Sequence, residues 1–278
     1  MDDLCCMKKL LTVIMRGLAC CSLLLSCNNE YFQAPPPVVN HLASKEIHYN
    51  FESGAKVGEK ELSYDSHGLI TREYFTSAIS DYFQEIRYEY DSEGNLLKKL
   101  TTDSQSDGKY FGLEYTYVDG LKKSESMTFD GNPTGYQTLY FHSGNEIDSS
   151  RMSYFSTQDN LYHYTNTTLY DYDPLGRMVR SYYKQGQYVT RYRYLNDNLA
   201  ESCDVIVDQT GEIVQGCVVN EYNDSGQLIK VSEVSPWWNT LKEEFFYKDG
   251  RLDEKKVYTY PAYEPGNTID ITLIKYEY

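Results

Sequence analysis

The sequence predicts an all-β repeat protein, a curved antiparallel meander of about nine β-hairpin repeats. Three observations lead to this fold class. Tyr occurs 29 times and Gly 18 times among 278 residues, and aromatic side chains favour the pleated surface of a sheet. No long stretch shows the apolar period of a helix. A strand–turn–strand pattern also recurs along most of the chain, which is typical of repeat architectures.

The segment from Leu169 to Val179 shows the repeated pattern most clearly. A Tyr-x-Tyr strand end leads into a turn from Asp173 to Gly176, and a second strand follows the glycine. Asp at the first turn position, Pro at the second and Gly at the fourth are typical of a type I turn closed by a left-handed glycine. The last aromatic residue before each turn marks the repeats, at Tyr64, Tyr90, Tyr117, Phe141, Tyr172, Tyr194, Tyr222, Tyr247 and Tyr278.

Irregular loops separate these regular turns, so each repeat holds two strands and two connections. An antiparallel meander places the regular turns along one edge of the sheet and the variable loops along the other. Tyr276 and Tyr278 begin a ninth copy that the sequence does not finish. About eighteen strands exceed what a twisted open sheet sustains, so we expect the sheet to curl, spiral or close on itself.

Apolar and polar side chains alternate along the strands, which predicts one buried and one solvated face. In the second repeat the expected buried face carries Ile86, Tyr88, Tyr90, Leu96, Lys98 and Leu100. The expected solvated face carries Arg87, Glu89, Asp91, Asn95, Lys99 and Thr101. We interpret the recurring tyrosines as core residues whose hydroxyl groups reach water.

The run Tyr-Asp-Tyr-Asp-Pro-Leu-Gly-Arg-Met, residues 170–178, resembles the YD repeat of the Rhs family, in which Tyr-Asp is followed by Gly-Arg-Leu. Residues 49–278 carry weaker copies of the same pattern. The resemblance implies a spiralling antiparallel sheet that often forms a shell. This sequence shows neither the long array nor the C-terminal toxin of that family, so we do not carry over its role in toxin encapsulation.

The N-terminal residues 1–26 have the features of a secretory signal peptide. Two lysines precede an apolar run at residues 10–25 that is short for a transmembrane helix. The run ends in Leu-Leu-Ser-Cys27, which resembles the lipobox of bacterial lipoproteins. That resemblance implies cleavage before Cys27 and its lipidation, as in an envelope lipoprotein of the Bacteroidetes type. A cleaved signal without lipid is the alternative.

The rest of the chain divides by composition. Residues 27–45 contain the proline-rich stretch from Ala34 to Pro37 and suit an extended tether. Residues 46–278 form the repeat domain. We expect the lipid to anchor the protein to the outer membrane, with the periplasmic and surface leaflets both open.

Charge and motifs exclude several function classes. The formal charge of −15 argues against nucleic acid as a partner, because an acidic surface repels phosphate. The five histidines are scattered, and no metalloprotease or nucleophile-elbow motif occurs. Adjacent carboxylates such as Glu243 and Glu244 suit solvated strand positions better than an acid–base pair across a cleft. We therefore expect no catalytic residue, metal or cofactor, and a protein that is not an enzyme.

Cys203 and Cys217 are the cysteines that follow Cys27. A strand, a turn and a strand separate them, and a turn that closes Asp208 against Glu212 places them directly opposite each other. Opposite residues lie about 4.5–5.5 Å apart, within reach of a disulfide, and an exported protein meets an oxidising compartment. We expect a disulfide. A bulge would instead place the two on opposite faces, and metal binding by the thiols is a weaker alternative.

Four aromatic residues on two variable loops form the candidate binding site: Trp237, Trp238, Tyr260 and Tyr263. The loops lie two strands apart in a meander, roughly 10 Å from the strand spacing. Exposed aromatic rings suit sugar rings or a partner protein. The alternative folds one Trp under the sheet as a core residue and stacks the other on Pro236.

The sequence therefore favours a non-enzymatic, lipid-anchored envelope protein that binds a glycan or an envelope protein partner through its variable-loop edge. Its only contact with the membrane is the N-terminal lipid. One alternative is a structural or assembly component whose sheet pairs with another chain. The other is a hydrolase with an unrecognised site.

Overall fold

The structure is a computed structural model that describes residues 42–209, 211–237, 239–260 and 270–278. The expected signal peptide, the lipidation site Cys27, Trp238 and Tyr263 lie outside these residues. Eighteen strands and no helix occur among the described residues. A helix long and apolar enough to span a membrane is absent from this part of the chain.

The strands are β1 (Lys45–Asn50), β2 (Lys56–Tyr64), β3 (Ile70–Ser77), β4 (Phe83–Tyr90), β5 (Leu96–Asp103), β6 (Phe111–Val118), β7 (Leu121–Phe129), β8 (Asn132–Ser143), β9 (Glu146–Ser156), β10 (Leu161–Tyr172), β11 (Met178–Tyr183), β12 (Tyr188–Leu195), β13 (Asn198–Asp208), β14 (Gly211–Tyr222), β15 (Leu228–Val234), β16 (Asn239–Lys248), β17 (Arg251–Thr259) and β18 (Asp270–Glu277).

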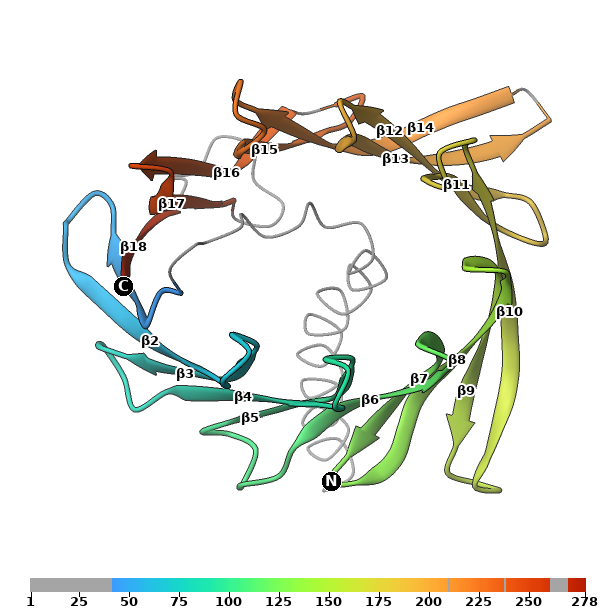
Figure 1. Ribbon diagram of the computed structural model, residues 1–278, viewed down its shortest axis with the longest axis horizontal. Coiled ribbons are helices and arrows are strands. Elements are labelled where there is room, and N and C mark those ends of the chain that lie inside the picture. Colours follow the sequence, from blue (N-terminus) through green and yellow to red (C-terminus); the bar gives the residue numbers. More distant parts are fainter. Residues whose placement is uncertain (1–41, 210, 238, 261–269) are drawn as a thin grey trace, which may run out of the picture. The chain divides into compact units, whose positions relative to one another are not determined.

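Every strand pairs antiparallel with the strands before and after it in the chain, and β18 returns to β1. Ile47 in β1, for example, lies opposite Lys275 in β18 and opposite Glu59 in β2. The strands therefore form a closed barrel and follow chain order around the ring (Figure 1). The predicted all-β meander of hairpins is confirmed, and the long sheet ends by closing on itself.

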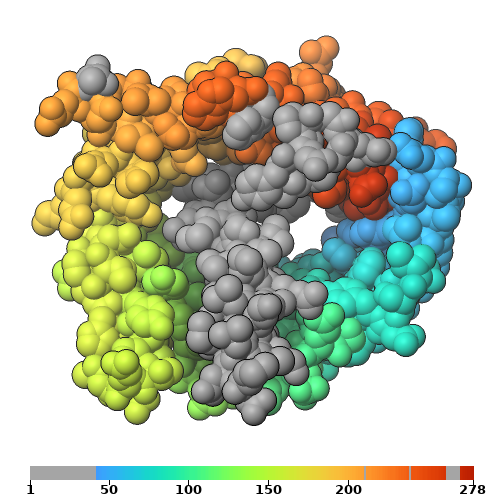
Figure 2. Space-filling view, turned by 180° about the vertical axis from the view of Figure 1, so that it is seen from behind, coloured from blue at the N-terminus to red at the C-terminus, as the bar shows by residue number. Residues whose placement is uncertain are grey.

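Strands from the two ends of the described chain make the ninth hairpin. β18 carries the unfinished ninth copy, and β1 supplies its second strand. The backbone N–H of Ser44 donates to the carbonyl oxygen of Glu277 at 2.7 Å, where the other hairpins have their regular turn. Figure 2 shows the N-terminal strands (blue) beside the C-terminal strands (red). Residues 42–45, assigned to the tether from the sequence, thus belong to the barrel.

Four of the regular turns share one hydrogen-bond pattern. After β2, a carboxylate oxygen of Asp65 accepts the backbone N–H groups of His67 at 2.8 Å and Leu69 at 2.9 Å. The glycine at the fourth turn position is left-handed, with φ of 80° at Gly68, a conformation that costs little only without a Cβ. The predicted type I turn is therefore present. The residues equivalent to Asp65 are Asp91, Asp173 and Asn223.

The marker tyrosines join successive hairpins at this rim. Backbone pairing of β3 with β4 ends at Arg72 and Arg87. Beyond it, the hydroxyl of Tyr90 donates to the carbonyl oxygen of Ile70 at 2.9 Å. These hydroxyls therefore bond to the backbone, whereas the sequence interpretation placed them in water. Six further pairs make the same bond: Tyr64–Ala43, Tyr172–Ile147, Tyr194–Met178, Tyr222–Leu199, Tyr247–Leu228 and Tyr278–Leu252.

A register shift beside the regular turns changes which side chains share a face. In the second repeat the shift falls at Tyr90, and it places Tyr88 opposite Lys99. Lys99 Nζ lies 6.0 Å from the centre of the Tyr88 ring. Lys98 lies on the other face, opposite Glu89. The face assignment for β5 was therefore wrong from Lys98 onward, because a bulge inserts one unpaired residue.

Both faces of the barrel carry charged side chains. The tyrosine face is the side that carries Tyr88, Tyr170, Tyr192 and Tyr276; the arginine face carries Arg72, Arg87, Arg180, Arg191 and Arg193. On the tyrosine face, Lys60 lies 2.9 Å from Glu73, and their side chains are 26% and 17% exposed. On the arginine face, Arg193 lies 3.0 Å from Glu201, with exposures of 61% and 30%. No large side chain of the described residues is fully buried, and the pair on the tyrosine face is less exposed than the pair on the arginine face.

Candidate functional site

The variable loops lie at the rim opposite the regular turns, as the meander requires. The connections there differ in length and sequence from one hairpin to the next. At the regular rim, by contrast, the connections are short and of two kinds: four five-residue turns and four two-residue turns. Because loops that vary on a rigid scaffold are where proteins place specific contacts, the variable rim is the part of the barrel able to distinguish ligands.

A cleft of ≈ 480 Å³ opens on this rim between β10, β11 and β12. A volume of this size is within the usual range for small-molecule sites. Its lining combines tyrosines, threonines, side-chain amides and one lysine: Tyr164, Thr165, Asn166, Thr167, Tyr183, Lys184, Gln185, Gln187 and Tyr188.

The cleft exists because neighbouring strands differ in length. β10 has 12 residues, whereas β11 has 6. Pairing between them reaches Thr168 opposite Tyr183, and a last bond runs from the N–H of Lys184 to the carbonyl of Thr167 at 2.8 Å. Residues 161–166 of β10 continue above the short β11–β12 hairpin, paired with β9 on one side only among the described residues. The missing neighbour leaves the space that the cleft occupies.

Two tyrosines stand at the base of the cleft, one on each side of the 184–187 loop. Tyr183 and Tyr188 are 40% and 55% exposed, and their ring centres lie 6.1 Å apart in an edge-to-face arrangement. A third ring, Tyr164, is 56% exposed, and its hydroxyl lies 3.2 Å from the Thr167 hydroxyl. Exposed rings held by such contacts present flat apolar surfaces at a small entropic cost, because their geometry is already set.

Polar groups in the cleft have unused hydrogen-bonding capacity. The side-chain amides of Asn166, Gln185 and Gln187 make no hydrogen bond within the described part of the chain, and each offers two donors and an acceptor. Lys184 likewise has no ion pair among the described residues. The described lining contains no carboxylate, histidine or cysteine, and Lys184 is its one charged side chain. This chemistry suits the binding of a polar, largely uncharged ligand.

The sequence-predicted aromatic site is described only in part. Trp237 lies in the loop after β15 and is 72% exposed, so it is not the core residue of the alternative interpretation. Tyr260 follows β17, and Lys242 Nζ lies 5.7 Å from its ring centre. Trp238 and Tyr263 fall outside the described residues. Neither Trp237 nor Tyr260 lines the cleft of β10 to β12.

The sequence analysis did not find the cleft. Its local signal is the run Tyr-Tyr-Lys-Gln-Gly-Gln-Tyr at residues 182–188, a polar loop with an aromatic residue at each end. That signal is weak, because tyrosines flank many of the turns. The depth of the cleft comes from the extra length of β10, and strand ends are the least certain part of any sequence-based prediction.

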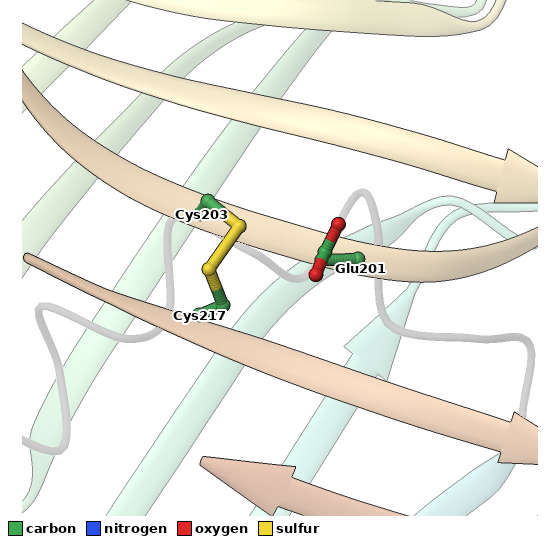
Figure 3. A group of neighbouring side chains, drawn as sticks. All are labelled: Glu201, Cys203 and Cys217. Carbon is green, nitrogen blue, oxygen red and sulfur yellow. A yellow bond between two sulfur atoms is a disulfide. The ribbon is translucent and has the colours of Figure 1, made fainter. Parts of the chain in front are cut away.

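Cys203 and Cys217 form a disulfide across β13 and β14. Figure 3 shows the two sulfur atoms bonded and Glu201 on the same side of the strands, with the opposite wall of the barrel behind them. The sulfurs and a Glu201 carboxylate oxygen lie within 4.8 Å of one another. Because the sulfurs are bonded to each other, they are not available as thiolate ligands. Glu201 instead pairs with Arg193 at 3.0 Å.

The register that joins the two cysteines differs from the one expected. The hairpin closes Asp208 against Gly211, one residue earlier than the turn assumed from the sequence. A register shift after Asp204 then adds one residue to β14. The two departures cancel, so Cys203 lies directly opposite Cys217.

Away from the cleft, the tyrosine face holds a network in which carboxylates pair with a lysine and a tyrosine hydroxyl. Lys60 lies 3.4 Å from Glu46 and 2.9 Å from Glu73, and the hydroxyl of Tyr88 donates to Glu73 at 2.6 Å. Burial opposes ionisation of Glu46, but the hydrogen bond to His48 and the charge of Lys60 outweigh it and hold the pKa of Glu46 below its usual value. A carboxyl group with a lowered pKa is a poor general acid.

No protein-family model and no curated protein matches the chain. Among solved structures, the Photorhabdus luminescens Tc holotoxin pore is 14% identical with a TM-score of 0.32, and the match covers 77% of this chain and 12% of the toxin chain. A porin-like protein from Bacteroides uniformis is 12% identical with a TM-score of 0.33, covering 88% of this chain and 98% of its own. A porin-like protein from Bacteroides vulgatus is 12% identical with a TM-score of 0.36, covering 85% and 98%. These likenesses are too distant to assign a function.

Proposed function

We propose that this protein is a non-enzymatic, lipid-anchored envelope protein that binds a glycan at its variable-loop rim. The single observation that carries the proposal is the cleft between β10 and β12. Exposed tyrosine rings lie there beside unpaired side-chain amides, and no carboxylate lines it. A protein partner at the same rim is the alternative.

A sugar ring has an apolar face of C–H groups and an equator of hydroxyl groups. The rings of Tyr183 and Tyr188 offer apolar surface for the C–H face of the sugar. The amides of Asn166, Gln185 and Gln187 offer both donors and acceptors for the hydroxyl groups of the sugar. Because the cleft is open along the rim, it could hold an internal segment of a polysaccharide as well as its end.

The proposed anchor is the lipid on Cys27, with the barrel in water rather than in the bilayer. A lipid-facing barrel needs a continuous apolar band on its outer face. Here the tyrosine face carries the Lys60–Glu73 pair and the arginine face carries the Arg193–Glu201 pair. Charged pairs on both faces would be costly in hydrocarbon, whichever face lies outside.

The test is a glycan and polysaccharide array probed with the purified full chain in detergent. We expect the Tyr183→Ala/Tyr188→Ala variant to lose at least about tenfold in affinity, or about 1.4 kcal/mol. A matched control is Tyr136→Ala/Tyr154→Ala. These two exposed tyrosines lie 5.6 Å apart outside the cleft, and removing them should leave binding unchanged.

The possible outcomes distinguish where the site lies, what it binds and whether the protein is an enzyme. Binding that survives loss of Tyr183 and Tyr188 but disappears in Trp237→Ala would move the site to the loop after β15. A wild-type chain that binds no glycan on the array would overturn the glycan proposal and favour a protein partner. Release of shortened glycan products by the wild-type chain would contradict the non-enzymatic assignment.

A further inference from the structure

The β13–β14 hairpin, which follows β12 in the chain, leaves one strand edge open. β14 spans Gly211–Tyr222, but its pairing with β15 begins only at Cys217, opposite Val234. Residues 211–216 pair with β13 on one side. On the other side no strand lies among the described residues. Figure 1 shows this hairpin in orange, reaching away from the ring.

This edge has a bulge between Val214 and Gly216 and one charge, but it lacks other features that usually keep open edges from pairing. Natural proteins protect such edges with lysine, proline or inward-pointing charges. The segment Gly-Glu-Ile-Val-Gln-Gly, residues 211–216, has neither lysine nor proline. Ile213 and Val214 are 44% and 43% exposed and point to opposite faces of the hairpin. The single charge, Glu212, forms an ion pair with Arg191.

The disulfide lies where the open edge begins. Cys217 is the first residue of β14 that pairs with β15, and its bond to Cys203 ties β14 to β13 at that point. An isolated two-stranded hairpin is only marginally stable. The covalent link therefore helps to keep the projecting hairpin formed while its outer edge has no neighbour.

We propose that the edge at residues 211–216 pairs antiparallel with the same edge of a second copy of this chain. Two antiparallel edges related by a two-fold axis perpendicular to the sheet form an isologous contact, in which a central residue faces its own copy. If that residue is Ile213 or Val214, two apolar side chains meet at the centre. Glu212 then lies opposite Val214 or Gly216, and the carboxylates do not face each other.

The net charge of the chain predicts how the dimer responds to salt. Each copy carries a formal charge of −15, so two copies repel over distances beyond the contact itself. Salt screens that repulsion, whereas the main-chain hydrogen bonds and apolar contacts of an added strand remain. The dimer therefore strengthens as salt rises. The open edge and the cleft involve different strands, so the dimer does not depend on the proposed glycan binding.

The experiment is sedimentation velocity of the full chain in detergent, with a Cys27→Ser variant alongside so that lipid cannot drive association. We expect a monomer–dimer equilibrium that shifts to dimer with concentration and salt. Val214→Lys, which places like charges near the two-fold axis, should weaken the dimer at least about tenfold. Val118→Lys, an equally conspicuous change at a residue 56% exposed in β6, should leave it unchanged.

Hydrogen–deuterium exchange of the wild type provides a second readout that needs no variant. At high protein concentration the amides of residues 211–216 should become more protected, while those at the other open edge, residues 161–166, should not. A wild type that stays monomeric at every concentration and salt overturns the proposal and leaves the edge to a strand from a different protein. A dimer that Val214→Lys does not weaken, with no change in protection at 211–216, overturns it equally.

Discussion

The hydroxyl of Tyr90 donates to the carbonyl oxygen of Ile70 at 2.9 Å, beyond the last backbone pair between their strands. The bond explains why tyrosine, an aromatic residue with a hydroxyl, marks most of the repeats. Successive hairpins separate near the regular turns, and a ring with a terminal donor is long enough to reach across. The same bond in six other repeats makes the tyrosine a link between hairpins rather than only a filler of the sheet face.

Replacing Tyr90 with Phe should lower the free energy of unfolding by about 1 kcal/mol, because one hydrogen bond is lost while the ring remains. Urea denaturation followed by circular dichroism measures the change. Tyr136→Phe is the control, since Tyr136 lies on β8 with no hydroxyl bond among the described residues and its loss should change stability little. Equal effects of the two variants would contradict the proposed link.

Alkaline pH should unfold the barrel. Burial raises the pKa of Tyr194 and of Tyr170 to about 12 in the folded protein, whereas an unfolded tyrosine titrates near about 10. The folded state keeps its protons where the unfolded state has lost them. Stability is therefore fully present below about pH 10 and declines as the pH rises toward about 12. Tyrosinate absorbance and circular dichroism should change together; titration of these residues without loss of structure would contradict the prediction.

Removing the disulfide with Cys203→Ser/Cys217→Ser should lower the free energy of unfolding by about 3 kcal/mol, the value expected for a closed loop of about 15 residues. The loop is short, with a sequence separation of 14, so the rest of the barrel should keep its fold. Urea denaturation of oxidised, reduced and double-Ser protein measures the effect. Identical midpoints for all three would show that the bond does not stabilise the hairpin.

Gly94→Ala should destabilise the protein by about 1–2 kcal/mol, because Gly94 has φ of 86° in a regular turn. Space is not limiting, since a Cβ there would meet Leu69 at 3.6 Å. Gly216→Ala is the matched control: its φ is not left-handed, and an added Cβ would meet only a carbonyl oxygen at 3.7 Å. Thermal unfolding should separate the two variants by several degrees. The reverse order would contradict the assigned turn conformation.

The features that could be predicted from the sequence depend on residues close together in the chain. Asp, Pro and Gly at fixed turn positions define the regular turns, because they act through local backbone geometry and one side-chain oxygen. The marker tyrosines gave the number and order of the strands. The prediction of which β5 side chains lie on each face was wrong, because a bulge shifts the register by one residue without changing the sequence pattern around Lys98.

The candidate site shows the same division. Exposed aromatics on the variable rim could be expected from the sequence, and Trp237 is indeed exposed. The cleft beside Tyr183 and Tyr188 could not be expected from the sequence, because it depends on β10 being longer than β11. The open edge at residues 211–216 arises in the same way, from the different lengths of β14 and β15.

The sequence by itself therefore determined the all-β class, the repeating hairpin, the turn type and the separation of a regular rim from a variable one. Only the tertiary structure decided that the sheet closes, with β1 completing the ninth hairpin begun by β18. It also decided where the cleft and the open edge lie. Closure of the barrel and the overhang of individual strands depend on the lengths, bulges and twist of all the strands together. A local stretch of sequence does not determine them.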